Sequence, residues 1–111
     1  MARKIVWAAA AWQDLEEAAD YIARDSENYA AAFVREVQDA TRTLALFAHK
    51  GRVVPEFKNK SIREVIVKNH RVIYRLPNET TIEILAIVHG ARDLWILWHK
   101  EGRELAEGED E

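Results

Sequence analysis

Apolar and polar residues alternate with two different periods along this chain of 111 residues. Residues 9–24 and 29–47 place apolar side chains every three or four positions, which is the period of a helix with one buried face. Because the polar break at 25–28 is short, we expect the two helices to form an antiparallel hairpin. Shorter apolar or alternating runs predict strands at residues 4–7, 62–67, 71–76 and 80–89.

The strands predicted at 71–76 and 80–89 carry the most information about function. Because strand side chains alternate between two faces, Arg71 and Arg75 point to one face and Tyr74 points to the other. The second strand is apolar on both faces from 82 to 88, which is typical of a strand buried on both sides. We therefore expect Tyr74 in the core. We expect the guanidinium groups on the face that the helices leave open, where they can meet a negatively charged partner.

The order of these elements predicts an α+β fold. A loop at 49–61 contains Gly51 and Pro55, which oppose long regular structure. Turns at 68–70, with Asn69 suited to a positive φ, and at 77–79 join the last three strands into an antiparallel meander. The result is a β-α-α-β-β-β two-layer sandwich, an N-terminal helical hairpin packed on an antiparallel sheet.

The C-terminal part changes in character. Leu94, Leu97 and Trp98 recur at helical spacing within 93–106, so a short helix is expected there. Since the large apolar side chains of 95–98 cannot all fit one narrow helical face, at least one should be exposed in the free chain. We take residues 1–98 as one domain and 99–111 as an acidic tail that is expected to be partly disordered.

Composition limits the possible classes of protein. With 49% hydrophobic and 32% charged residues, the chain suits a single soluble globular domain. It has no cysteine, so it has neither disulfides nor thiolate metal sites, and this composition suits a reducing cytoplasm. The four histidines follow no metal-binding spacing, and no glycine-rich phosphate loop is present, so no metal or cofactor is expected. No apolar run reaches 18 residues, and the run that follows residues 1–4 is soon interrupted by Gln13, Asp14 and Glu16, so neither a membrane span nor a signal peptide is expected.

The net charge of -3 is unevenly distributed. Residues 101–111 hold six acids and one base, whereas residues 50–75 hold eight bases and two acids. The basic stretch predicts a surface for an acidic partner, although lysines that guard a sheet edge would look the same. The acidic tail could fold weakly over that surface, but a solubilising role is the simpler interpretation.

Seven short stretches, in order, resemble the RelE/ParE toxin superfamily of bacterial type II toxin–antitoxin systems. They are Ile-Val-Trp at 5–7, Asp-Leu-Glu-Glu at 14–17, Ala-Asp-Tyr-Ile at 19–22, Gly-Arg-Val-Val-Pro-Glu-Phe at 51–57, Ile-Arg-Glu-Val at 62–65, Arg-Val-Ile-Tyr-Arg at 71–75 and Ile-Val-His-Gly-Ala-Arg-Asp-Leu at 87–94. The stretches at 51–57 and 89–94 are most similar to the ParE branch. The resemblance covers residues 3–95.

This resemblance implies a plasmid-stabilising toxin that binds DNA gyrase and blocks it, and that is neutralised by an acidic, ParD-like antitoxin. Such a toxin needs a recognition surface and no catalytic residues. On this interpretation the target- or antitoxin-binding residues are Arg63, Arg71, Arg75, Arg92, Trp95 and Trp98. Tryptophan and arginine are the residue types most often found as binding hot spots.

Two alternatives remain open at this stage. RelE-like members cut messenger RNA on the ribosome, and in this chain Arg71, Arg92 and His89 could serve that reaction. The lysines on the first meander strand of such nucleases are replaced here by Ile62 and Glu64, which counts against cleavage. The second alternative is a degenerate toxin fold that binds an antitoxin without being toxic.

Overall fold

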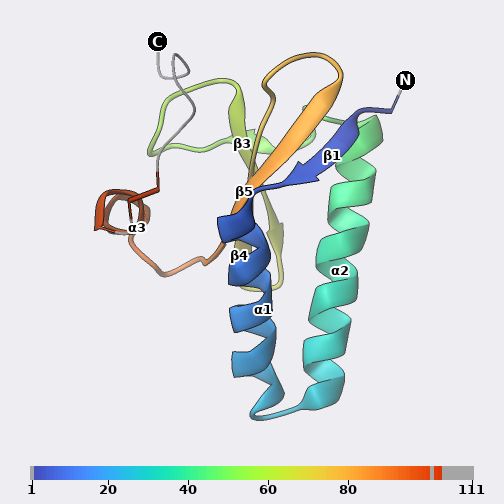
Figure 1. Ribbon diagram of the computed structural model, residues 1–111, viewed down its shortest axis with the longest axis vertical. Coiled ribbons are helices and arrows are strands. Elements are labelled where there is room, and N and C mark those ends of the chain that lie inside the picture. The colour runs from blue at the N-terminus through green and yellow to red at the C-terminus, as the bar shows by residue number, and fades with distance from the viewer. Residues whose placement is uncertain (1, 101, 104–111) are drawn as a thin grey trace.

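The computed structural model describes residues 2–100 and 102–103. It contains β1 (Lys4–Trp7), α1 (Ala9–Ala23), α2 (Glu27–Leu46), β2 (Arg52–Val53), β3 (Ile62–Val67), β4 (His70–Arg75), β5 (Thr81–His89) and α3 (Leu94–Lys100). The predicted β-α-α-β-β-β order is confirmed, and Figure 1 shows α1 and α2 side by side as a hairpin. The short strand β2 was not predicted. Most of the predicted helix end at 101–106 and most of the acidic tail lie outside the described residues.

One five-stranded sheet organises the fold, with the strand order β1-β5-β4-β3-β2. Strands β2 to β5 pair antiparallel, as predicted for the meander, but β1 pairs with β5 in parallel, so the sheet is mixed. The register between β4 and β5 shifts at Ile73 and Tyr74. The shift keeps Arg75 opposite Glu83 on the same face of the sheet.

Local signals explain how the elements begin and end. Ser26 caps α2, because its hydroxyl accepts a hydrogen bond from the backbone N–H of Tyr29 at 3.0 Å. In the β3–β4 turn the positive φ belongs to Lys68, at 53°, and not to Asn69 as the sequence suggested.

Among the described residues, no helix has both the length and the apolar character needed to cross a membrane.

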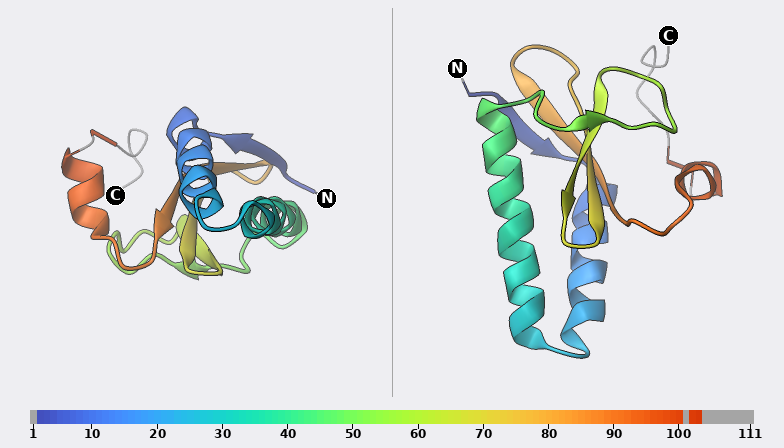
Figure 2. Two further views of the ribbon diagram at one scale, coloured as in Figure 1. Left: turned by 90° about the horizontal axis from the view of Figure 1, so that it is seen from below. Right: turned by 180° about the vertical axis from the view of Figure 1, so that it is seen from behind.

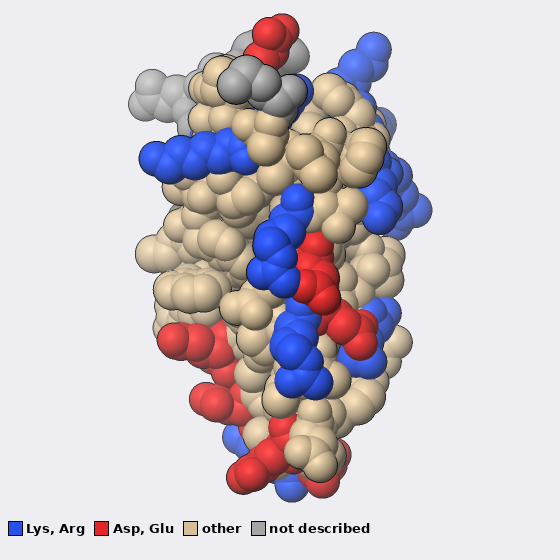
Figure 3. Space-filling view, turned by 90° about the vertical axis from the view of Figure 1, so that its right-hand side faces the viewer, with Lys and Arg blue, Asp and Glu red and all other residues tan. Residues whose placement is uncertain are grey.

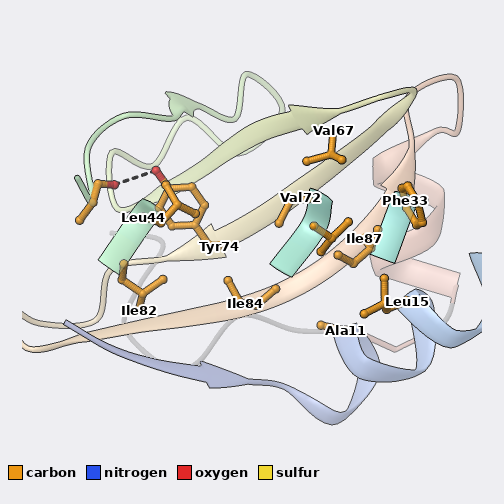
Figure 4. Close-up of a cluster of buried hydrophobic side chains, with 12 residues drawn as sticks. Ala11, Leu15, Phe33, Leu44, Val67, Val72, Tyr74, Ile82, Ile84 and Ile87 are labelled. Atoms are coloured by element: carbon orange, nitrogen blue, oxygen red, sulfur yellow. Dashed lines mark hydrogen bonds between the residues drawn. The ribbon is translucent and has the colours of Figure 1, made fainter. Parts of the chain in front are cut away.

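The main hydrophobic core lies between the helical hairpin and the sheet (Figure 4). Phe33 and Leu44 of α2 belong to this core together with Tyr74 of β4 and Ile84 of β5, and all four are fully buried. The Tyr74 hydroxyl donates to the backbone oxygen of Ala48 at 2.7 Å, which confirms Tyr74 as a core residue.

A second, smaller core covers the reverse face of the sheet. Ile62, Ile73 and Ala86 on that face are fully buried under Leu94 and Leu97 of α3. Figure 2 shows α3 set apart from the two hairpin helices. The reverse face, which the sequence predicts to be open, is therefore covered by α3.

Candidate interaction surface

Arg71 lies on the reverse face, as the alternation of β4 predicted, but it is not displayed there. Its side chain is only 9% exposed. Its Nε donates to Glu64 at 2.6 Å, and its two terminal nitrogens donate to the carboxylate of Glu56 at 3.0 and 2.8 Å. The expectation of an exposed guanidinium is wrong because the loop after β2 crosses this face and brings Glu56 over it.

Glu64 is the centre of this network. Its side chain is fully buried, and it accepts a second hydrogen bond, at 2.6 Å, from Nε of Arg52. The hydrogen bond from Arg71 lowers the pKa of Glu56, and the same pairing raises the pKa of Arg71 further above its ordinary value. Because each partner stabilises the charged form of the other, the Glu56–Arg71 pair is ionised at neutral pH.

The other sheet arginines are also held by neighbours. Arg75 is paired with Glu83 across β4 and β5, and its side chain is 14% exposed. Arg63 points to the opposite face from Arg71, since it pairs in register with Tyr74. It donates to the backbone oxygens of Gly51 and Lys60, at 2.9 and 3.1 Å. The basic stretch therefore does not form one arginine-bearing surface.

Of the three residues considered for RNA cleavage, His89 and Arg92 line one groove between the helical hairpin and the ends of β4 and β5, but Arg71 lies apart from them. Arg71 faces the reverse side, while His89 pairs in register with His70, and their rings lie 5.3 Å apart. The ring of His70 in turn lies 4.8 Å from that of Phe33 in the hairpin. His89 therefore lies on the hairpin side of the sheet. Arg92 is exposed in the loop that follows.

The exposed aromatic surface on α3 matches the expectation from its sequence. Trp95 and Ile96 are 49% and 53% exposed, whereas Trp98 is 7% exposed and belongs to the second core. The ring of Trp95 stacks on His99 at 5.0 Å and meets the edge of Phe57 at 6.0 Å. We use the name α3 aromatic surface for the exposed side chains of Trp95 and Ile96 on α3 together with the neighbouring ring of Phe57 from the loop after β2.

Sequence reasoning missed the residues that neutralise the arginines. Glu56 and Glu64 are the two acids within the basic stretch, and Glu64 occupies the strand position that faces the same side as Arg71. That placement was a usable signal for Glu64. The approach of Glu56 depends on how the 54–61 loop folds, and sequence periodicity does not report this. On the face drawn in Figure 3, basic and acidic side chains likewise lie directly beside one another along the middle of the molecule.

Comparisons with known proteins agree with this architecture. Residues 5–94 match the family model described as ParE toxin of type II toxin-antitoxin system, parDE. A solved structure titled "Chromosomal ParDE TA system from P. aeruginosa" superposes with a TM-score of 0.63 at 20% identity, covering 78% of this chain and 95% of that chain. Among curated proteins no match was found. Because the family match spans most of the chain, this protein belongs to the ParE toxin family of type II toxin–antitoxin systems.

Proposed function

We propose that this chain is a toxin that acts in the cytoplasm by binding DNA gyrase and blocking it, and that a ParD-like antitoxin neutralises it. Membership of the ParE toxin family supports the class of activity. The structure supports a binding mode of action, because the chain presents exposed aromatic side chains on α3 as well as on the helical hairpin, and no assembled set of catalytic groups among the described residues.

The observation that carries the proposal is the state of Arg71. A ribonuclease of this fold needs cations aimed at the scissile phosphate. Here the guanidinium is buried and is already bound by two carboxylates, Glu56 and Glu64. A phosphate would have to displace both carboxylates and then remain beside them, and their negative charge would repel it.

The α3 aromatic surface is the best candidate for the gyrase contact. Trp95 is half exposed although its side chain is large and aromatic, and Arg92 is exposed a few residues before it. An exposed tryptophan that becomes buried in an interface contributes on the order of 2 kcal/mol or more to binding. On this proposal, Arg71 and Arg75 mainly stabilise the fold through their ion pairs.

An antitoxin of the expected acidic type would meet the lysines of the basic stretch. Lys50, Lys58 and Lys60 are exposed, whereas Lys68 is ion-paired with Glu36 at 3.2 Å. These loop lysines favour fast, salt-dependent association with an acidic chain more than they add affinity.

The test is a gyrase supercoiling assay with the purified chain, comparing Trp95→Ala with Trp12→Ala. Both tryptophans are 49% exposed, but Trp12 lies on α1. We expect the wild-type chain and the Trp12 variant to inhibit supercoiling, and the Trp95 variant to need roughly 30-fold more protein, which corresponds to about 2 kcal/mol. Growth arrest in cells with normal supercoiling at saturating toxin would refute the gyrase assignment.

The same expression strain distinguishes the alternatives. Codon-phased cuts in translated messages, seen by primer extension and lost in Arg71→Lys, would instead support a ribosome-dependent nuclease. Tight binding of an antitoxin by a chain that causes no growth arrest would identify a non-toxic binding module.

A further inference from the structure

The sheet ends at β1, and the outer edge of this strand is open to pairing. In the strand order β1 lies next to β5, and no other described strand lies beyond it (Figure 4). The backbone N–H groups of Lys4 and Ala8 donate on the β5 side, at 2.8 and 2.9 Å. Because successive residues of a strand direct their backbone groups to opposite sides, the N–H and C=O groups of Ile5 and Trp7 point away from β5.

The sequence of β1 does little to prevent pairing at this edge. Proteins protect edge strands with proline, bulges or several charged side chains. Strand β1 reads Lys-Ile-Val-Trp, with no proline and a single charge at its first position. Ile5 and Trp7 pack toward the main core, so alternation places Val6 on the reverse face, where it is 38% exposed.

An exposed apolar surface adjoins the first end of β1. The backbone N–H of Arg3 donates to the backbone oxygen of Ala45 at 2.8 Å, which brings the end of α2 beside the start of the strand. The next two residues of the chain, Leu46 and Phe47, are 65% and 62% exposed. Together with Arg3 they line an open depression with a volume of about 870 Å³.

A second exposed apolar side chain adjoins the other end of β1. Trp12 lies in the first turns of α1, which begins two residues after the strand ends. Its side chain is 49% exposed, and its ring lies 4.8 Å from that of Trp7. The two ends of the edge strand therefore carry different apolar surfaces.

We propose that two copies of this chain pair through β1, antiparallel and related by a two-fold axis at Val6. In this register Ile5 of each copy exchanges both backbone hydrogen bonds with Trp7 of the other. Val6 lies opposite Val6 of the second copy, in a pair that makes no hydrogen bond. The two five-stranded sheets then form one continuous sheet.

The register follows from the backbone groups that the edge offers. A shift toward the start of the strand would pair Ile5 with itself and set Trp7 opposite Arg3, whose N–H is already bonded to Ala45. A shift the other way would pair Trp7 with itself and set Ile5 opposite Ala9, the first residue of α1. Only the proposed register pairs all the outward groups of the edge with one another.

Self-complementary side chains favour a second copy over an unrelated chain. Antiparallel pairing sets Lys4 opposite Ala8 of the other copy, so no like charges face each other. It also brings the start of α1 in one copy, with Trp12, toward the end of α2 in the other, with Leu46 and Phe47. Because a two-fold interface repeats every contact, the apolar surfaces at both ends of the strand find partners.

This inference goes beyond the proposed function and does not depend on the toxin's target. Figure 2 shows α3 and β1 on opposite sides of the molecule. Pairing through β1 therefore leaves the α3 aromatic surface accessible in both copies. A variant that breaks the dimer is expected to keep that surface.

Charge variants at the two-fold axis test the proposal by sedimentation over a concentration series. The wild-type chain should dimerise, whereas Val6→Lys and Val6→Glu each place like charges opposite one another and should be monomers. An equimolar mixture of the two variants should dimerise again. Ile66→Lys is the matched control and should dimerise, because Ile66 is an apolar side chain of β3 that is 58% exposed and lies away from β1 in the sheet.

A disulfide tests the register without adding charge. The chain has no cysteine, so Val6→Cys gives one thiol per copy. Opposed residues that share no hydrogen bond have Cα atoms about 4.5 Å apart, within the range of about 4.4–6.8 Å that a disulfide spans. Under mild oxidation Val6→Cys should give a linked dimer, whereas Lys4→Cys and Ile66→Cys should not.

Truncation of the tryptophan tests the contact at the ends of the strand. Trp12→Ala should raise the dissociation constant of the dimer roughly 30-fold. Tyr21→Ala, in a side chain of the same helix that is 69% exposed, should leave the constant unchanged. Equal effects of the two variants would remove Trp12 from the interface.

Three results would overturn the proposal as a whole. They are a wild-type chain that stays monomeric throughout the series, a dimer that Val6→Lys leaves intact, and a mixture of the lysine and glutamate variants that does not dimerise. A monomer whose amides at Ile5 and Trp7 become protected from hydrogen exchange only when an acidic partner chain is added would assign the edge to that chain instead. All of these measurements are independent of gyrase inhibition, so a failure here leaves the proposed function standing.

Discussion

Replacing Arg71 by alanine should destabilise the protein, because Arg71 balances buried charge. Removing one member of a buried ion pair costs about 3–5 kcal/mol when the remaining charge has no other partner. Glu64 is fully buried but would keep Arg52, and Glu56 is 28% exposed and can turn toward water. The expected cost for Arg71→Ala is therefore lower, about 2–3 kcal/mol.

Arg52→Ala is the matched control, since Arg52 bonds to the same carboxylate from outside. Its side chain is 65% exposed, and Glu64 would keep its bond to Arg71. Its loss should cost less than about 1 kcal/mol, as for other exposed ion pairs. Arg71→Lys should fall between the two, because lysine keeps the charge but cannot bond to Glu56 and Glu64 with a planar fork.

Urea unfolding followed by circular dichroism measures these differences. With slopes of about 1–3 kcal/mol per molar urea, the midpoint of Arg71→Ala should fall by roughly 0.7–3 M at an unchanged slope. A midpoint equal to that of the wild type, together with lost toxicity, would refute the structural interpretation. It would return Arg71 to the list of contact residues, as the sequence alone suggested.

Three further predictions concern stability. Phe33→Ala should cost about 3–5 kcal/mol by emptying the main core, measured by the same urea titration. Gly51→Ala should lower the melting temperature, because a Cβ there would lie 2.6 Å from the backbone oxygen of Glu64 and 2.6 Å from the hydroxyl of Tyr74. A variant as stable as the wild type would contradict the close approach of these two atoms to Gly51. The pKa of His70 in the folded protein lies below its ordinary value of 6.5, so the unfolded chain takes up the proton first as the pH falls. The contribution of neutral His70 to stability is therefore complete above pH 6.5 and is lost as the pH falls from 6.5 toward the lowered pKa. In urea midpoints measured over this pH range, His70→Gln should reduce the loss of stability on the acid side.

The fold was predictable where the signals are local. The helical hairpin and the antiparallel meander follow from apolar periodicity, a short break between helices and turn residues, and each of these acts over a few positions. The parallel pairing of β1 with β5 was not predictable in this way, because it joins Lys4 to Thr81 across most of the sequence. The spacing of apolar residues predicted α3, but it did not predict which face of the sheet α3 covers.

Arg71 shows the same limit at the site. Alternation along β4 correctly placed its side chain on the reverse face of the sheet, because that depends only on its own strand. Its burial depends on a carboxylate 15 residues away in a loop and on another 7 residues away in the neighbouring strand. Whether a strand arginine is a recognition residue or a structural one is thus decided by what crosses its face.

That distinction also bears on how one fold can serve two kinds of toxin. A sheet face with cations aimed at solvent can stabilise charge on a phosphate, whereas the same face with Glu64 at its centre holds its cations in internal pairs. Because Arg71 and Arg75 are paired internally in this way, we expect contacts with a macromolecule to come from other side chains. The half-exposed Trp95, packed against Phe57 of the loop that also carries Glu56, is one of the exposed surfaces that this arrangement leaves available. The ion-pair network and the aromatic surface are thus two consequences of one loop crossing the reverse face of the sheet.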